Sequence, residues 1–86
     1  MSAVTAISID EALELLAEIF EEPIENITAE TRRGDVEGWD SLGELSIMAE
    51  FDERFGIILD TKALDNFKLV SDLLEVLQDN QALSGG

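Results

Sequence analysis

The chain has 86 residues, which is enough for one domain whose core is near the smallest that folds without disulfide or metal cross-links. It contains no Cys, His or Tyr, which excludes disulfides and thiolate metal sites and disfavours an enzyme that works through its side chains alone. Twenty acidic residues against five basic ones give a formal charge of −15, which disfavours nucleic acid and anionic membranes and favours basic surfaces of other proteins as partners.

The segment up to Ile7 lacks the basic region and the apolar run of a secretory signal. No stretch of the sequence approaches the roughly 20 apolar residues that a membrane-spanning helix needs. We therefore expect a cytoplasmic protein without a membrane span, and we expect it to be a monomer.

Residues 9–21 are predicted to form the first helix, because apolar residues recur there at spacings of three and four. The recurring residues are Ile9, Ala12, Leu13, Leu16, Ile19 and Phe20. Ser8 and Glu11 have the spacing of a capping box at its start, and Pro23 disfavours helical geometry at Glu22. Both ends of this helix therefore have a local cause.

Residues 23–39 show no sustained period and are predicted to form a long connection, which must be either pinned to the core or functional. The residues expected to pin it are Ile24, Ile27, Val36 and Trp39. Gly34 and Gly38 are expected to supply turns. Trp39 either packs against the helices, which we favour because an exposed indole would waste its apolar area, or stacks on a ligand.

The second helix is predicted from Ser41 to Phe55, with Gly56 as a left-handed cap at its end. At 100° per residue its side chains fall into two sectors. The sector predicted to face the core comprises Leu45, Ile47, Met48, Phe51 and Phe55. The sector predicted to be exposed comprises Leu42, Ser46, Ala49, Glu50 and Glu53.

Two further helices are predicted in the remaining sequence. A short one covers residues 61–67 with Asp60 or Thr61 as its cap, and the last one opens at Ser71 and Asp72. The inner face of the last helix comprises Leu73, Leu74, Val76 and Leu77. Residues 80–86 are expected to be frayed, which leaves an ordered core of about residues 8–79 in a single domain spanning 1–86. The sum is an all-α protein with three longer helices and one short third helix.

The segment Gly38-Trp39-Asp40-Ser41-Leu42 carries the functional signal. It resembles the acyl carrier proteins, in which Asp-Ser-Leu opens the second helix of a four-helix bundle. Those three letters alone occur by chance, but the resemblance covers about residues 8–79. It includes the long loop between helices 1 and 2, the acidic second helix, the Phe55-Gly56 helix end and the short third helix. The resemblance therefore implies a four-helix bundle of the acyl-carrier type.

The resemblance implies that Ser41 carries 4′-phosphopantetheine as a covalent cofactor, with Asp40 beside it, and that the thiol of the cofactor holds an acyl chain as a thioester. The position also suits a phosphoryl group physically, because a helix N-terminus offers unpaired N–H groups and the positive end of the helix dipole. Taken alone, Ser41 could instead be a helix cap paired with Glu44 in a second capping box, unless Asp40 is the cap.

The resemblance also implies partners that bind along the second helix. These are a phosphopantetheinyl transferase, a ligase that loads an acyl or aminoacyl group, and downstream transferases or synthases. The residues that match this surface are Asp40, Leu42, Ser46, Ala49, Glu50 and Glu53. Leu42 would be the apolar anchor, while Glu50 and Glu53 would meet Arg or Lys of each partner in brief, salt-sensitive contacts. The alternative is an ordinary solvated helix face.

The residues that could line an apolar space for cargo between the second and third helices are Leu45, Met48, Leu64 and Phe67. They are in the first place core residues. Departures from the pattern of fatty-acid-synthesis carriers are Trp39, Gly43, Ser46 and Arg54. These departures favour a specialised freestanding bacterial carrier over the housekeeping protein of fatty acid biosynthesis.

Three functions remain open at this point. The first is an acyl carrier of a specialised pathway, for modified fatty acids, polyketide-like products or acylated surface polymers. The second is an aminoacyl or peptidyl carrier with the same attachment chemistry, because the loading enzyme and not the motif selects the cargo. The third is an acidic helical scaffold or calcium-binding domain, although Asp35, Glu37 and Asp40 do not meet the ligand spacing of a calcium loop.

Overall fold

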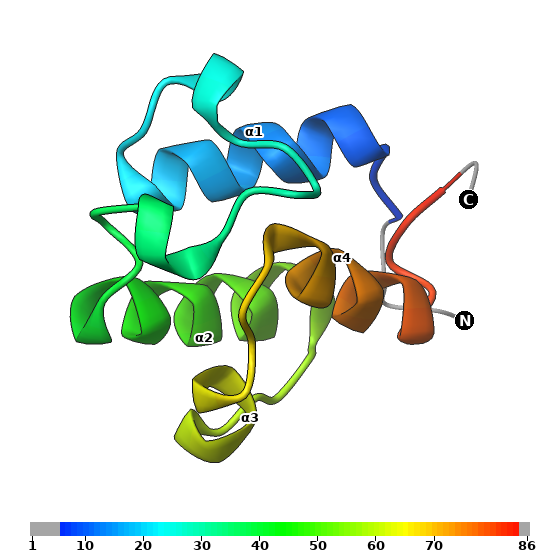
Figure 1. Cartoon of the computed structure of the whole chain (residues 1–86). Coiled ribbons are helices and arrows are strands. Elements are labelled where there is room, and N and C mark those ends of the chain that lie inside the picture. The colour runs from blue at the N-terminus through cyan, green and yellow to red at the C-terminus, as the bar shows by residue number, and fades with distance from the viewer. Residues whose placement is uncertain (1–5, 85–86) are drawn as a thin grey trace.

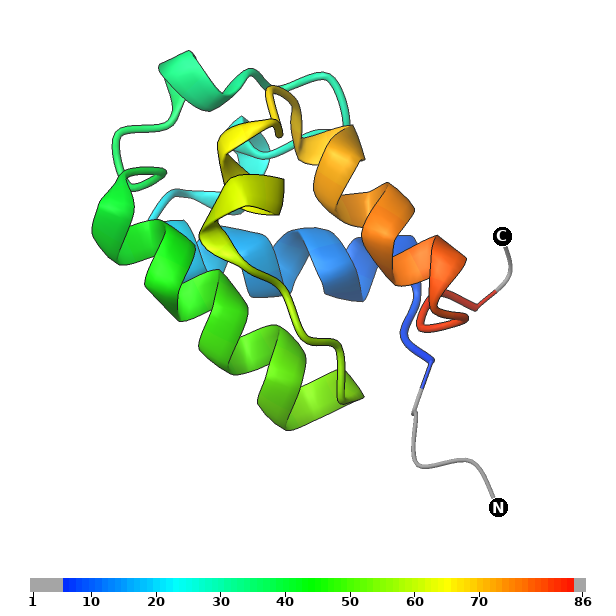
Figure 2. The same ribbon diagram turned by 90° about the horizontal axis from the view of Figure 1, so that it is seen from below.

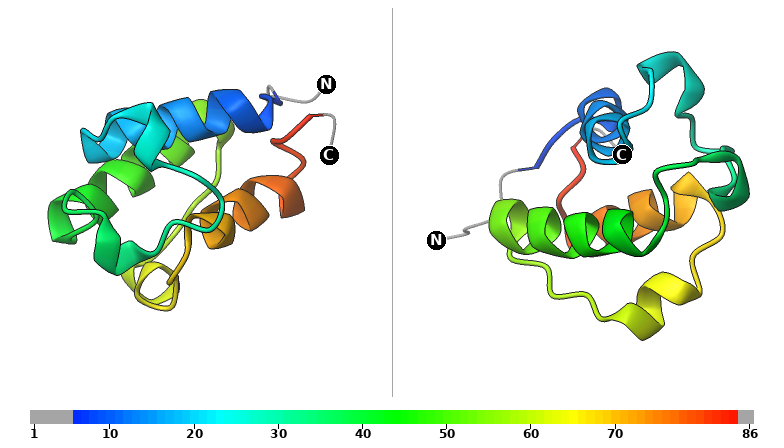
Figure 3. Two further views of the ribbon diagram at one scale, coloured as in Figure 1. Left: turned by 45° about the horizontal axis from the view of Figure 1, so that its top comes forward. Right: turned by 90° about the vertical axis from the view of Figure 1, so that its left-hand side faces the viewer.

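The computed structural model describes residues 6–84, in which four α-helices surround one hydrophobic core and no strand forms (Figure 1). The elements are α1 (Ile9–Phe20), the 3₁₀ turns η1 (Ile24–Asn26) and η2 (Arg33–Asp35), α2 (Ser41–Phe55), α3 (Thr61–Asp65) and α4 (Val70–Asp79). The helix α1 lies on one side of α2 and α4, and α3 lies on the opposite side (Figures 1 and 3). The predicted all-α four-helix bundle with a short third helix is therefore confirmed.

The ends of α1 follow from local signals. Ser8 Oγ accepts a hydrogen bond from the Glu11 N–H at 3.1 Å, and Glu11 Oε1 accepts one from the Ser8 N–H at 3.0 Å, so the predicted capping box is present. The helix ends at Phe20, one residue earlier than predicted, because Glu21 adopts a left-handed conformation with φ 56°. The Glu21 N–H still bonds to the carbonyls of the last turn, which closes the helix before Pro23.

The bounds of α2 are those predicted, with Gly56 at φ 68° as its left-handed cap. The helix α3 has Asp60 as its cap, since Asp60 Oδ1 accepts a hydrogen bond from the Ala63 N–H at 2.8 Å. It ends at Asp65, two residues before the predicted end at Phe67, because the chain tightens there and the Phe67 N–H bonds to the Leu64 carbonyl three residues back.

The helix α4 begins at Val70, one residue before the predicted start at Ser71. The reason is that the Asp72 carboxylate reaches back to accept hydrogen bonds from the N–H groups of Lys68 and Leu69, at 2.8 and 3.0 Å. This acid therefore supports the helix from its third position, and the predicted first residues already lie within the first turn. Its predicted inner face is mostly correct, with Leu73, Leu74 and Leu77 buried and Val76 half-buried.

The core is built from one face of each long helix together with residues of α3 and of the connections. Its largest fully buried side chains are Leu16, Ile27, Ile47, Phe51, Leu64, Val70, Leu73 and Leu77. The prediction that Leu45 faces the core is wrong, because 59% of this residue is exposed. The inner face of α2 includes Gly43, Glu44 and Ile47, so it is turned toward Glu44 and away from Leu45.

The connection from α1 to α2 is hydrogen-bonded to the segment between α3 and α4 and to the first residue of α4. The Arg33 N–H donates to the Lys68 carbonyl at 2.8 Å, and the Val70 N–H donates to the Thr31 carbonyl at 2.9 Å. Ile27, Val36 and Trp39 are buried as predicted, but Ile24 is 48% exposed on η1, so its predicted pinning role is wrong. The three buried residues thus hold the connection together with backbone hydrogen bonds, which the hydrophobic pattern alone does not reveal.

The residues after α4 fold back onto the start of the chain. Ala82 is fully buried, its carbonyl accepts a hydrogen bond from the Ile7 N–H at 2.9 Å, and the Ile7 carbonyl accepts one from the Ser84 N–H at 2.8 Å. The prediction that fraying begins at residue 80 is therefore wrong up to residue 84, because Ala82 contributes apolar area that the spacing of α4 does not indicate. Residues 85 and 86 of the predicted frayed tail lie outside the described residues.

Candidate functional site

Asp40 is the N-cap of α2. Its Oδ1 accepts a hydrogen bond from the Gly43 N–H at 3.0 Å, and its carbonyl accepts one from the Glu44 N–H at 2.8 Å. The alternative in which Ser41 caps the helix with Glu44 is thus wrong. Ser41 is the first helical residue and is exposed, and its hydroxyl is not among the hydrogen bonds formed within residues 6–84. The site therefore presents a hydroxyl that the helix does not need for its own start.

Two glycines bring three backbone segments into direct contact beside Ser41. A Cβ added to Gly38 would lie 2.2 Å from the Phe20 carbonyl oxygen, at the end of α1. A Cβ added to Gly43 would lie 2.1 Å from the Gly38 carbonyl oxygen. The end of α1, the turn at Gly38 and the first turn of α2 thus touch without side chains between them. This close approach fixes where Ser41 sits relative to α1.

Trp39 holds the turn before the site to the core. It is only 4% exposed, and its ring stacks on that of Phe20 with centroids 5.1 Å apart and an interplanar angle of 18°. On the ring of Trp39 lies the guanidinium of Arg33, 5.7 Å from the centroid. The predicted packing role of Trp39 is confirmed. Its Nε1 is buried and has no hydrogen-bond partner among the described residues.

Arg33 and Glu44 form an ion pair that sequence reasoning missed. Arg33 Nη2 contacts Glu44 Oε2, while Nη1 donates to the Leu64 carbonyl at 3.0 Å. The side chains are 28% and 9% exposed, respectively. One signal could have revealed the pair: Glu44 shares a helix face with Ile47 and Phe51, and an acid at an inward position requires a cationic partner.

Apolar residues gather on the outer side of α2 and on the following link. Leu42 is 68% exposed, Leu45 59% and Ile58 78%, and Met48 beside them is half-buried. We call Leu42, Leu45, Met48 and Ile58 the apolar strip. Part of it borders a shallow cavity of about 350 Å³, which is lined by Leu45, Met48, Ala49, Asp52, Ile58 and Leu59. Of the apolar strip, only Leu42 belongs to the predicted exposed sector of α2, and Leu45 and Ile58 do not.

The acidic residues predicted along α2 differ in their availability. Asp40 and Glu53 are exposed, as are the neighbouring predicted residues Ser46 and Ala49. Glu50 is half-buried, and its Oε1 accepts a hydrogen bond from Arg54 Nε at 2.6 Å. This hydrogen bond raises the pKa of Arg54 above its ordinary value. Glu53 is therefore the more accessible of the two predicted contact acids.

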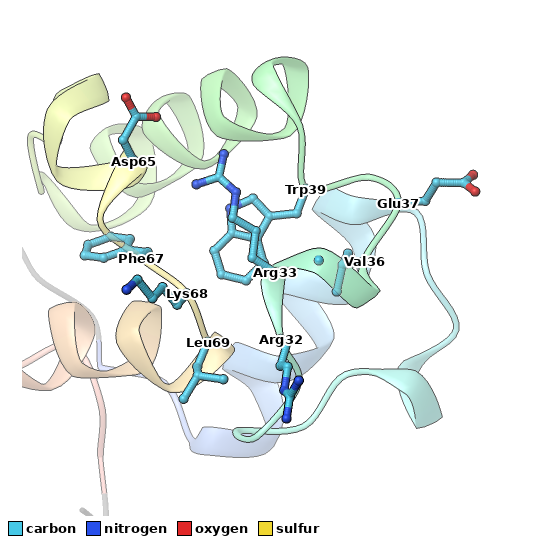
Figure 4. Close-up of a pocket in the computed structure, with 10 residues that line it drawn as sticks. Arg32, Arg33, Val36, Glu37, Trp39, Asp65, Phe67, Lys68 and Leu69 are labelled. Carbon is cyan, nitrogen blue, oxygen red and sulfur yellow. The ribbon is translucent and has the colours of Figure 1, made fainter.

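The four residues predicted to line a cargo space are not brought together. Leu45 and Met48 border the shallow cavity, whereas Phe67 borders a larger one of about 960 Å³ beside Trp39 and Arg33 (Figure 4). Leu64 is fully buried and borders neither cavity. The prediction of a common apolar space fails because Leu45 turns outward and the Arg33–Glu44 pair stands between α2 and α3.

Within residues 6–84 no helix is both long and apolar enough to cross a bilayer. Over the same residues, no three metal-binding side chains are grouped so that they could hold an ion. Comparison with protein-family models, with curated proteins and with solved structures found no significant match.

Proposed function

We propose that this protein is a carrier that bears 4′-phosphopantetheine on Ser41 and presents an acyl or aminoacyl group to partner enzymes. The observation that carries the proposal is the division of roles between neighbouring residues at the start of α2. Asp40 caps the helix, and the exposed Ser41 hydroxyl is therefore available for esterification without loss of the cap. The identity of the cofactor is inferred from the resemblance of the Asp40-Ser41-Leu42 segment to the acyl carrier proteins.

The surroundings of Ser41 fit a phosphodiester. The first turn of an α-helix has N–H groups without helical partners, and the dipole of the 15-residue α2 places partial positive charge there. When bound, the cofactor supplies the thiol that a chain without Cys lacks. This chain's own residues hold the attachment point in place: Asp40 fixes the helix start, and Gly38 and Gly43 set it against α1.

The apolar strip and the charge of the chain support docking by basic partner surfaces. Exposed Leu42 and Leu45 lie on the first turns of α2 next to Ser41, and Ile58 extends this surface. Exposed Glu53 and Asp52 border it further along the helix. A net charge of −15 steers partners with Arg or Lys patches toward the chain, while a small apolar contact permits rapid release.

The pathway and the place of action belong to the same proposal. We propose that the protein is a cytoplasmic monomer. We also propose that it serves a specialised biosynthetic pathway, because Trp39 and Gly43 depart from the pattern of fatty-acid-synthesis carriers. Both departures have packing reasons, because Trp39 stacks on Phe20 and a side chain at Gly43 would strike the Gly38 carbonyl. Its partners would be a phosphopantetheinyl transferase, a loading ligase and downstream transferases or synthases.

Incubation with a broad-specificity phosphopantetheinyl transferase and coenzyme A is expected to add one phosphopantetheine to the wild type and none to Ser41→Ala. Intact-mass spectrometry measures the gain. Ser84→Ala is the matched control, because Ser84 is an exposed serine outside the predicted partner surface and its loss should leave the mass gain unchanged. A wild type that stays unmodified, or a Ser41→Ala variant that gains the group, would contradict the proposal.

Leu42→Ala and Leu45→Ala are each expected to lower kcat/KM for this modification about tenfold, which corresponds to ~1.4 kcal/mol of binding. Both side chains are exposed, so circular dichroism should show unchanged helicity. Ile9→Ala is the control, since Ile9 is an exposed apolar residue at the opposite end of α1 from Phe20. Equal rates for the strip variants and the wild type would remove the apolar strip as the docking surface.

A further inference from the structure

Arg33 links three elements at the end of the bundle where α2 begins. From η2 its side chain reaches Glu44 on α2 and the Leu64 carbonyl on α3, with 3.0 Å between Nη1 and the carbonyl oxygen. Figure 4 shows this side chain crossing the face of Trp39 with its guanidinium directed toward α2 and α3. We call Arg33, Glu44 and the Leu64 carbonyl the Arg33 latch.

The Arg33 latch stands beside Ser41. Glu44 lies three residues after Ser41, in the first turn of α2, and its side chain turns inward while Ser41 is exposed. In Figure 2, α3 lies across the space between α2 and α4. Because the guanidinium contacts Glu44 on α2 and the Leu64 carbonyl on α3, a group that enters between these helices on the side of Arg33 meets it before it reaches the fully buried Ile47 and Leu64.

Opening the latch has a physical cost. Displacing the guanidinium would leave the Glu44 carboxylate, whose side chain is 9% exposed, without its cationic partner. A buried charge that loses its partner is strongly unfavourable, and the Leu64 carbonyl and the face of Trp39 would lose their contacts in addition. Burial of an alkyl chain is favourable because the chain leaves water, but here the chain can enter past Arg33 only after this set of contacts has been broken.

We infer that the Arg33 latch keeps the thioester-bound group outside the bundle, so that the cargo is a short or polar group, such as an aminoacyl or a hydroxyacyl group, and not a long alkyl chain. This inference rests on the proposed carrier function. A long alkyl chain that cannot enter the bundle would keep much of its apolar surface exposed even if it lay in the shallow cavity of the apolar strip, and exposed apolar surface favours association. A short or polar group needs no shelter and stays within reach of the enzymes that process it.

The larger cavity of Figure 4 differs from the closed interior because it is open to solvent. Charged side chains stand around it, including Arg32, Asp65 and Lys68, together with the apolar side chains of Val36, Trp39, Phe67 and Leu69. An alkyl chain placed there would contact these apolar side chains but would remain partly exposed beside charged groups that prefer water. The single Trp of the chain nevertheless makes occupation of this cavity measurable.

The test compares the acetyl and octanoyl forms of the protein, made with the transferase from acetyl- and octanoyl-coenzyme A. Methyl resonances of Ile47 and Leu64 and the indole resonance of Trp39 are recorded by NMR. In the wild type we expect these resonances to be the same in both forms. Methyl shifts that depend on chain length would show entry past the latch, and a shift at Trp39 alone would show binding in the larger cavity; either result overturns the inference.

The double variant Arg33→Met with Glu44→Leu tests the latch itself. It replaces both charges by apolar groups of similar size, a change that is often tolerated. In this variant the methyl resonances of Ile47 and Leu64 are expected to differ between the octanoyl and acetyl forms. If these resonances are the same in both forms, the latch does not exclude cargo. If the double variant fails to fold, the wild-type comparison still decides. Failure of the carrier function is seen separately, as absence of any mass gain on Ser41.

Discussion

Alanine in place of Gly38 is expected to lower the free energy of unfolding by about 3 kcal/mol, because the new Cβ would strike the backbone of Phe20. The Cβ would lie 2.2 Å from the carbonyl oxygen, 2.9 Å from the carbonyl carbon and 3.0 Å from the Cα. None of these atoms belongs to a side chain that can rotate away, so the end of α1 and the turn must separate. Urea denaturation followed by circular dichroism measures the loss.

Two further glycines sharpen this prediction. Nothing lies within 4 Å of a Cβ added to Gly34, so Gly34→Ala should change the free energy of unfolding by less than about 0.5 kcal/mol. Gly43→Ala tests the sign, because alanine raises helix propensity by about 1 kcal/mol whereas its Cβ would lie 2.1 Å from the Gly38 carbonyl oxygen. We expect destabilisation, and a more stable Gly43→Ala variant would contradict the close approach.

Features with local causes could be predicted from the sequence. The start of α1 follows from the reciprocal bonds of Ser8 and Glu11, and the end of α2 follows from the left-handed conformation that Gly56 accepts. The fold class and the exposure of Leu42 follow from the spacing of apolar residues along each helix. At both helix ends the residues that decide the structure lie within about one helical turn of each other.

Features decided by distant parts of the chain could not be predicted in this way. Glu44 turns inward because Arg33, eleven residues earlier, supplies a cation, and this orientation places Leu45 outside the core. Ala82 is buried because Ile7 pairs with the segment after α4. The predicted cargo space failed for the first of these reasons: hydrophobic spacing identifies apolar residues but not a charged pair placed between the helices that carry them.

Trp39→Ala is expected to lower the free energy of unfolding by about 3 to 5 kcal/mol, the range for truncating a buried large aromatic residue. The indole is 4% exposed, stacks on Phe20 and supports the Arg33 guanidinium, so its removal leaves a cavity and weakens the Arg33 latch. Such a loss is a large share of the stability of a small domain. Thermal or urea denaturation of the variant measures it.

Trp39→Phe separates the packing of the ring from the polar group that the ring carries. Phenylalanine keeps a ring that can stack on Phe20, and it removes the Nε1 donor that is buried without a partner in the described part of the chain. Because an unsatisfied donor is itself unfavourable, part of the lost area is offset, and the net loss should stay within about 1.5 kcal/mol. A loss as large as that of Trp39→Ala would mean that Nε1 has a partner, such as a bound water. The turn before Ser41 would then contain a buried polar contact.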